Sequence, residues 1–253
     1  MTIKNRICII TGGGSGIGRA TAIRFARDGS NVFLVGRTLS KVERVRQEIE
    51  SAGGTAKAYE IDVSDHDGVV GMVEEIERLH GAVDLLVNNA GHSSPHRRLL
   101  STPPDEIQSV IDSNLIGTIY CTQAVMPKML DRDSGTIVNV SSLAGVTPGL
   151  LGGMIYSAVK AAIINFTGYL NDEFKDTNIR ASVVIPGEIA TPVMEKRPVP
   201  PNADARKTMV NPEDVAEAIA LIAGLPQKSS IPELIIRPTL HRDVSGELTD
   251  AWV

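Results

Sequence analysis

The stretch TGGGSGIG, residues 11–18, lies between an apolar run and the start of a helical pattern. The apolar run, RICIIT at residues 6–11, predicts a buried strand. Gly12 permits a tight turn, Gly16 lets a phosphate approach the backbone, and Gly18 allows close helix–strand packing. The free N–H groups and the positive dipole end of such a helix favour phosphates. The stretch therefore predicts a nucleotide-binding strand–turn–helix unit, although its glycines follow G-x-x-x-G-x-G spacing rather than G-x-G-x-x-G.

Short β-rich runs alternate with longer helical runs through the rest of the chain, as a parallel sheet requires. Several runs are apolar on both faces, which is typical of strands buried between two helical layers. The expected strands are residues 6–11, 31–36, 56–62, 83–89, 135–142, 179–185 and 232–238. No linker divides them. We therefore expect residues 1–253 to form one doubly wound, Rossmann-type α/β domain with a seven-stranded, mostly parallel sheet and helices on both faces.

Three helix starts carry capping signals. Ser40 and Glu43 predict a capping box for a helix over residues 40–54. A helix over residues 102–110 would have Thr102 as its cap and Pro103 at its first position. The same logic gives residues 211–224 a start at Asn211 and Pro212.

Two segments fall outside this alternation. Residues 186–210 are rich in proline and charge and follow the carboxyl end of a strand, where ligands bind in open α/β sheets. We expect a substrate lid at residues 188–210, with a solvated loop as the alternative. Residues 239–253 form a polar C-terminal tail whose Trp252 would either pack on a partner subunit or fray.

Composition restricts the class of protein. A chain of 253 residues with 42% hydrophobic and 22% charged residues has the material for a full core. A net charge of −5 and no basic run argue against a nucleic-acid binder. Cys8 and Cys121 lie in apolar runs without metal-ligand spacing, so we expect buried thiols and no metal site. Strand-like residues from Ile7 and no apolar run of ~20 residues lead us to expect a cytoplasmic protein without a membrane span.

YSAVK, residues 156–160, places Tyr156 and Lys160 one helical turn apart. Ser141 and Ser142 end the preceding strand, and Asn114 precedes that strand. Reduction of a ketone needs hydride on carbon and a proton on oxygen. A tyrosine has a pKa near ~10, and a neighbouring ammonium lowers it, so this pair suits proton transfer. A serine hydroxyl would polarise the carbonyl oxygen. The alternative is an ordinary surface contact between a phenol and an ammonium.

With these residues in place, the chain resembles the short-chain dehydrogenase/reductase family, in its branch of about 250 residues. The resemblance covers residues 6–225 and is carried by TGGGSGIG, NNAG at 88–91, Asn114, SS at 141–142, YSAVK and PG at 186–187. It implies Tyr156 as general acid/base, with Lys160 lowering the pKa of Tyr156 and binding the nicotinamide ribose. It further implies that Ser142 orients the substrate carbonyl, with Ser141 as a rival because the segment to Tyr156 is one residue longer than usual. Asn114 would hold a water in the proton relay.

The resemblance also implies a set of cofactor contacts and a homo-oligomer, either a dimer or a tetramer. Asp62 and Val63 would meet the adenine, although Asp62 is also suited to capping a turn. Pro186, Gly187, Ile189 and Thr191 would hold the nicotinamide carboxamide. Tyr156 and Lys160 would also contact the cofactor. The remaining contacts lie in the glycine-rich turn and the NNAG segment: Gly12, Gly14, Ser15, Gly16, Ile17, Gly18, Asn89, Ala90 and Gly91. The NNAG segment would also stabilise the end of its own strand.

The end of the second expected strand reads Val35-Gly36-Arg37, where a carboxylate would grip the ribose 2′-hydroxyl of NAD. A carboxylate there would repel the 2′-phosphate of NADP, whereas Arg37 offers a planar cation suited to it. Thr38 and Ser40 would add hydroxyl donors. We therefore expect NADP(H) to be preferred, with NAD(H) as a possible cofactor. The alternative is that Arg37 is a solvated strand-end residue.

The substrate is poorly encoded. His92, His96, Arg97 and Arg98 follow NNAG, and we favour a solvated loop there over arginines that meet an acidic substrate. We expect a small carbonyl compound or secondary alcohol and an NADP(H)-dependent oxidoreductase. An NAD-dependent alcohol dehydrogenase with the same catalytic residues is the first alternative. A non-catalytic dinucleotide-binding regulatory protein is the second, although it would not need Tyr156 and Lys160.

Overall fold

The structure, a computed structural model, describes residues 3–197 and 199–248. Its sheet has the order β3-β2-β1-β4-β5-β6-β7, and every neighbouring pair of strands is parallel. The predicted doubly wound α/β fold is therefore confirmed. The strands are β1 (Ile7–Thr11), β2 (Asn31–Gly36), β3 (Thr55–Glu60), β4 (Leu85–Asn88), β5 (Gly135–Val140), β6 (Ile179–Pro186) and β7 (Glu233–Ile236).

The central strands are apolar on both faces because both faces are covered. Successive side chains of a strand point to opposite faces. In β1, Cys8 and Ile10 join one core cluster and Ile7 and Ile9 join the other. Each cluster continues into the helices on its own side of the sheet. Both cysteines are buried free thiols, as expected, and burial raises the pKa of each to about 12.

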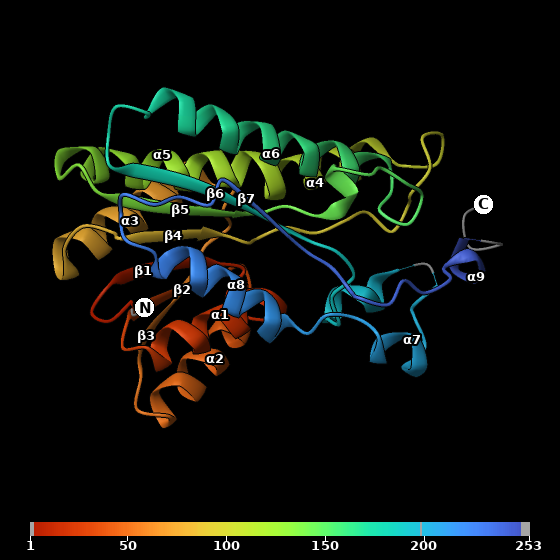
Figure 1. The fold of residues 1–253 in the computed structure, drawn as a ribbon, viewed down its shortest axis with the longest axis horizontal. Coiled ribbons are helices and arrows are strands. Elements are labelled where there is room, and N and C mark those ends of the chain that lie inside the picture. Colours follow the sequence, from red (N-terminus) through yellow and green to blue (C-terminus); the bar gives the residue numbers. More distant parts are fainter. Residues whose placement is uncertain (1–2, 198, 249–253) are drawn as a thin grey trace.

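Helices cover the two faces of the sheet in two layers (Figure 1). One layer holds α1 (Gly16–Arg27), α2 (Leu39–Ser51) and α8 (Pro212–Gly224), and the other holds α3 (His66–His80), α5 (Gly117–Asp131) and α6 (Met154–Glu173). The remaining elements are shorter: α4 (Pro104–Ile111), the π-helical turn η1 (Asp112–Ile116), the 3-10 turns η2 (Leu143–Gly145) and η3 (Pro192–Lys196), α7 (Ala203–Lys207) and α9 (Ser245–Leu248).

Two of the three predicted helix starts are wrong. The N-cap of α2 is Thr38, so Ser40 lies inside the helix, and Glu43 accepts a hydrogen bond from Arg46 Nε at 2.8 Å. The start of α4 lies one residue later than predicted, with Pro103 as the N-cap. The Thr102 hydroxyl is committed instead to the carbonyl of Arg98 at 2.7 Å. The start of α8 at Asn211 is confirmed.

The segment after β6 is more regular than predicted. Residues 188–210 contain η3 and α7, and Ile189 forms a parallel bridge with Val210. The side chain of Asn202 caps α7 by accepting a hydrogen bond from the Ala205 N–H at 2.8 Å. In the described part of the C-terminal tail, α9 lies beside this segment (Figure 1). The expectation for Trp252 falls outside the described residues.

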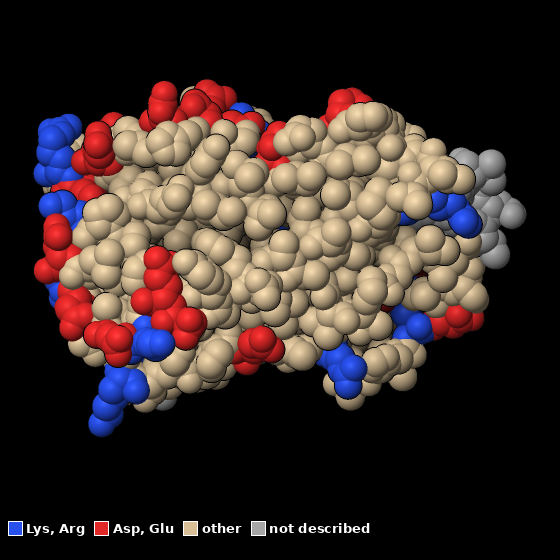
Figure 2. Space-filling view, turned by 90° about the horizontal axis from the view of Figure 1, so that it is seen from above, with Lys and Arg blue, Asp and Glu red and all other residues tan. Residues whose placement is uncertain are grey.

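The surface above α5 and α6 carries few charges over its middle, whereas acidic and basic side chains gather at its rim (Figure 2). Tyr169 of α6 and Leu130 of α5 are exposed apolar side chains. Among the described residues, none of the helices combines the length and apolar composition that a membrane span requires.

Candidate active site

The glycine-rich turn joins β1 to α1 with its backbone exposed to a cleft. Gly12 and Gly16 have φ angles of +65° and +52°, in the left-handed region that favours glycine. The first helical hydrogen bond runs from the N–H of Arg19 to the carbonyl of Ser15 at 3.1 Å. The N–H groups of residues 16–18 precede this bond, so they are the orphan donors of the helix N-terminus. A Cβ atom at Gly18 would collide with the Gly12 carbonyl, which explains the close helix–strand approach.

The NNAG segment holds this turn in place. The hydroxyl of Thr11 accepts hydrogen bonds from the N–H groups of Asn89 and Ala90, each at 3.0 Å. The Asn89 side chain donates to the carbonyl of Thr11 at 3.0 Å. The segment thus ties the end of β4 to the end of β1, and it lines the cleft as well.

The cleft has a volume of about 210 Å³ and lies at the carboxyl ends of β1, β4, β5 and β6. It brings together most of the residues predicted from sequence: Gly12, Ser15, Gly16, Ile17, Asn89, Ala90, Gly91, Asn114, Ser142, Tyr156, Lys160, Pro186, Gly187, Ile189 and Thr191. Parallel strands end at one edge of the sheet, which is why residues so distant in sequence meet here. The prediction did not include Val193 and Met194, which line the cleft from η3.

Seven predicted cofactor residues lie outside this cleft, among them Ser40, which lies inside α2. Gly18 packs inside the turn, Gly14 packs against Lys41, Thr38 caps α2, and Val63 is buried against Gly117. Arg37 and Asp62 line a separate hollow of about 300 Å³, in which Arg37 Nη1 lies 3.8 Å from Asp62 Oδ2. Asp62 also accepts hydrogen bonds from the N–H and hydroxyl of Ser64 at 3.0 and 2.7 Å, which is the turn-capping alternative.

Tyr156, Lys160 and Ser142 line the same cleft. Lys160 is 5% exposed, and its Nζ donates to the carbonyl of Val140 at 2.9 Å. Ser142 lines both the cleft and the adjoining cavity, and its Oγ accepts a hydrogen bond from the Ala144 N–H at 3.2 Å. The buried hydroxyl of Ser141 instead donates to the Lys160 carbonyl at 2.7 Å.

Burial changes the acidity of both members of the Tyr156–Lys160 pair. It raises the pKa of Tyr156, and hydrogen bonding to Ser142 and the charges of Arg97 and Arg197 oppose this effect. Burial lowers the pKa of Lys160 to about 8. Lys160 was expected to be the cation that lowers the pKa of Tyr156, whereas the charges that lower it in the structure are those of Arg97 and Arg197.

Asn114 lies in η1, a π-helical turn of the kind that is often found at functional sites. Its Nδ2 donates to the carbonyls of His92 and Val110 at 2.8 and 2.9 Å. Its Oδ1 is buried without a partner and lies against Gly91, where a Cβ atom would collide with it. The side chain is therefore fixed at its nitrogen while its oxygen keeps an unused acceptor.

A second cavity of about 250 Å³ adjoins the cleft and shares Ser142 and Tyr156 with it. Its charged wall consists of Arg97, Glu188 and Arg197. The sequence interpretation of residues 92–98 as a solvated loop is wrong for Arg97, which is 5% exposed. Glu188 and Arg197 gave no sequence signal beyond being charges in the segment after β6.

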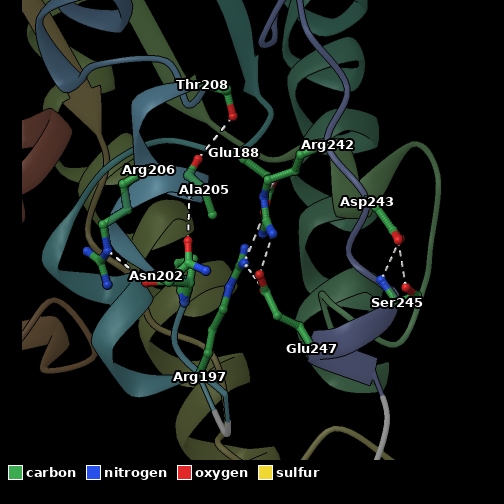
Figure 3. Close-up of polar contacts among 11 residues, drawn as sticks. Glu188, Arg197, Asn202, Ala205, Arg206, Thr208, Arg242, Asp243, Ser245 and Glu247 are labelled. Atoms are coloured by element: carbon green, nitrogen blue, oxygen red, sulfur yellow. Dashed lines mark hydrogen bonds and ion pairs between the residues drawn. The ribbon is translucent and has the colours of Figure 1, made fainter.

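Glu188 and Arg197 belong to a cluster of alternating charges with Arg242 and Glu247 (Figure 3). Arg197 Nη1 lies 3.0 Å from Glu188 and 3.1 Å from Glu247. Arg242 donates to Glu188 at 2.7 and 2.8 Å and also pairs with Glu247. We call these four residues the ion quartet. It connects the end of β6 and η3 to the C-terminal segment.

Comparison with known proteins adds independent findings. The family model described as short chain dehydrogenase matches residues 6–200. The 3-oxoacyl-[acyl-carrier-protein] reductase of Thermotoga maritima is 35% identical over 233 residues, which are 88% of this chain and 92% of that protein. A metagenomic short-chain oxidoreductase solved with NADP has 30% identity and a TM-score of 0.82, over 95% of this chain and 100% of that one. A serine dehydrogenase solved with NADP⁺ has 27% identity and a TM-score of 0.84, over 94% and 100%.

Proposed function

This chain belongs to the short-chain dehydrogenase/reductase family and is an oxidoreductase, and from that premise we propose that it interconverts a small carbonyl compound and a secondary alcohol with NADP(H). The observation that supports the proposal most directly is the position of Tyr156 and Ser142 at the junction of two cavities. The glycine-rich turn lines one of these cavities, whereas no residue of that turn lines the other. A hydride carrier and a substrate would therefore meet at the Tyr156 hydroxyl.

The residues of the cleft fit a dinucleotide. The N-terminus of α1 would offer its orphan N–H groups and positive dipole end to the pyrophosphate of a dinucleotide. A Cβ atom at Gly16 would lie 3.2 Å from Cγ2 of Thr191, so a side chain at position 16 would narrow the cleft where the phosphates enter. Pro186, Gly187 and Ile189 would hold the nicotinamide end, since they line the same cleft beside Tyr156.

Arg37 supports NADP(H) over NAD(H). It follows β2 without a carboxylate at the strand end, and its side chain is 58% exposed. At 3.8 Å from Asp62 it makes only a long ion pair, so its guanidinium has donors left for a 2′-phosphate. Both solved neighbours described above contain the phosphorylated cofactor.

In reduction, Ser142 would donate a hydrogen bond to the substrate carbonyl oxygen, and Tyr156 would transfer its phenolic proton to that oxygen. In oxidation, Tyr156 would take the proton back. The bound cofactor supplies or accepts the hydride. The Lys160 ammonium, held by the Val140 carbonyl, would favour the phenolate that remains after proton transfer. The unused Oδ1 of Asn114 supports its proposed part in holding a relay water.

A screen of ketones and secondary alcohols with NADPH, NADH and their oxidised forms tests this function. The Tyr156→Phe variant should lose about 10²- to 10⁴-fold in kcat/KM while cofactor binding stays within a few-fold of wild type. The matched control is Tyr59→Phe, at a tyrosine of β3 whose hydroxyl donates to Glu75 at 3.1 Å outside the cleft, and it should keep wild-type activity. Unchanged turnover in Tyr156→Phe would refute the mechanism. Cofactor binding without turnover of any compound would favour the regulatory alternative.

We also propose a homo-oligomer that uses the face above α5 and α6. The sparse charge of this face supports this assignment (Figure 2). The two helices beneath it also expose apolar side chains, Leu130 of α5 and Tyr169 of α6. Light scattering after size-exclusion chromatography should give two or four times the chain mass of 27.0 kDa. A single chain mass at micromolar concentration would contradict it.

A further inference from the structure

Arg97 is a buried cation whose hydrogen-bonding capacity is largely unused. Its side chain lines the second cavity and is 5% exposed. Nη1 donates to the carbonyl of Gly152 at 2.7 Å, whereas Nε is buried without a partner. Among the described residues, none places a carboxylate within 4.0 Å of it. A buried cation without a carboxylate beside it carries a large desolvation cost, which a bound anion would offset.

Arg180 shows how the same chain accommodates a buried arginine that needs no ligand. It is 4% exposed, and its guanidinium is surrounded by acceptors. Its five N–H donors reach the hydroxyl of Thr136 and the carbonyls of Ile222, Ala223, Leu225, Pro226 and Ser229. Arg97 has one such acceptor. Its environment is therefore not that of a structural arginine.

The neighbouring charges do not compensate Arg97. Arg197 and Glu188 share its cavity, but both are members of the ion quartet. The quartet contains two arginines and two glutamates and is neutral by itself. The charged wall of the cavity thus keeps one net positive charge, located at Arg97. Burial lowers the pKa of Arg97 to about 10, so the guanidinium is still a cation at neutral pH.

We propose that Arg97 binds the carboxylate of the substrate, and that the substrate is a small oxo acid or the corresponding hydroxy acid. The inference rests on the proposed function, because it places the substrate carbonyl at Ser142 and Tyr156. A planar guanidinium with free donors matches a carboxylate in geometry. One net positive charge matches a monoanion better than a dianionic phosphate ester. A cavity of about 250 Å³ has room for a small oxo acid.

A fixed carboxylate would also orient the carbonyl. Arg97 and Tyr156 line the same cavity, and their charges act on each other's pKa. A substrate held at one end by Arg97 has its other polar group directed to Ser142 and Tyr156, which lowers the entropy lost on reaching the reactive geometry. Arg97 is therefore a specificity-determining residue in this proposal, and it does not transfer a proton.

The kinetic test compares acids with their methyl esters. The probes are 2-oxobutanoate, 3-oxobutanoate and 4-oxopentanoate, each paired with its ester and reduced with NADPH. Wild type should favour at least one acid over its ester by about 10-fold or more in kcat/KM. Arg97→Gln should lower kcat/KM for that acid about 30-fold or more and leave the ester within about 3-fold. Arg98→Gln, which removes the exposed neighbouring arginine, is the matched control and should change neither.

A binding measurement separates this inference from the proposed function. Butanoate and butanamide are titrated by calorimetry into protein saturated with NADP⁺. Butanoate should bind more tightly than butanamide, which lacks the negative charge. Arg97→Gln should weaken the binding of butanoate about 30-fold or more. Arg97→Lys keeps the charge without the planar fork and should bind butanoate with intermediate affinity, which guards against a folding defect in Arg97→Gln.

The outcomes are distinct. The inference is overturned if acids and esters are reduced with equal kcat/KM and butanoate binding does not depend on Arg97. If Tyr156-dependent reduction of neutral ketones is found at the same time, the proposed function still holds. Arg97-dependent binding of butanoate without reduction of any carbonyl compound supports the carboxylate site and overturns the proposed function.

Discussion

The Lys160 ammonium lies 5.5 Å from the centre of the Tyr156 ring, one helical turn away on α6, while its hydrogen bond goes to the carbonyl of Val140. The pair therefore combines a cation and a phenol inside the protein, where water screens their interaction weakly. Burial disfavours the charged form of each group, which raises the pKa of Tyr156 and lowers that of Lys160. Burying the pair therefore costs the folded protein stability whenever either group is charged.

Replacing Lys160 with methionine should stabilise the cofactor-free protein at neutral pH while abolishing turnover. Burial lowers the pKa of Lys160 from 10.5 to about 8. Between these values the unfolded chain binds more protons than the folded one, so the free energy of unfolding of wild type rises with pH. Below pH 8 wild type carries the full cost of the buried ammonium, which is ~3 kcal/mol for a pKa change of this size.

Urea unfolding at pH 7, 8.5 and 10 measures this effect. The free energy of unfolding of Lys160→Met should exceed that of wild type most at pH 7, and the difference should shrink toward pH 10. Lys175→Met, at an exposed lysine paired with Asp172, controls for the loss of an ammonium without burial. A difference that stays constant with pH would show that the Lys160 ammonium is not the source.

Replacing Arg37 with aspartate should shift the cofactor preference toward NADH. The substitution removes a donor to the 2′-phosphate and adds a carboxylate that repels it and accepts from a 2′-hydroxyl. Loss of one charged hydrogen bond, ~1.5–3 kcal/mol, should lower the ratio of kcat/KM with NADPH to that with NADH by about 10- to 100-fold. Arg44→Asp makes the same charge change at an exposed position of α2 and should leave the ratio unaltered. A wild-type protein that prefers NADH would count against the role of Arg37.

Replacing Glu247 with glutamine should weaken the connection between the C-terminal segment and the second cavity. The change leaves Arg197 and Arg242 with Glu188 as the remaining carboxylate of the quartet, and the quartet side chains are only 10–21% exposed. We expect a loss of ~1–3 kcal/mol in the free energy of unfolding and a higher KM for substrate, because Arg197 lines the cavity. Denaturant unfolding and amide hydrogen exchange over residues 240–248 measure these effects. Glu233→Gln on the exposed end of β7 is the control, and equal exchange in both variants would contradict the prediction.

The sequence predicted the elements whose identity depends on local pattern. The turn at residues 11–18, the strands and the one-turn spacing of Tyr156 and Lys160 all follow from side-chain periodicity and glycine placement. Helix starts were less predictable. Ser40 and Thr38 are both suitable cap residues by type, and α2 begins after Thr38 without a hydrogen bond from its side chain. The family resemblance is confirmed by the match over residues 6–200.

Arg97 and Arg98 mark the limit of what sequence determines here. They are adjacent and identical in type, yet Arg97 is buried in the second cavity and Arg98 is exposed. The difference arises because the loop that ends at Gly153, more than fifty residues away, packs on Arg97: its Gly152 carbonyl accepts from Nη1. The sequence by itself determined the fold class and the Tyr156–Lys160 pair, because these depend on residues close together in the chain. Only the tertiary structure decided which charges are buried and paired, because desolvation depends on segments that meet through folding.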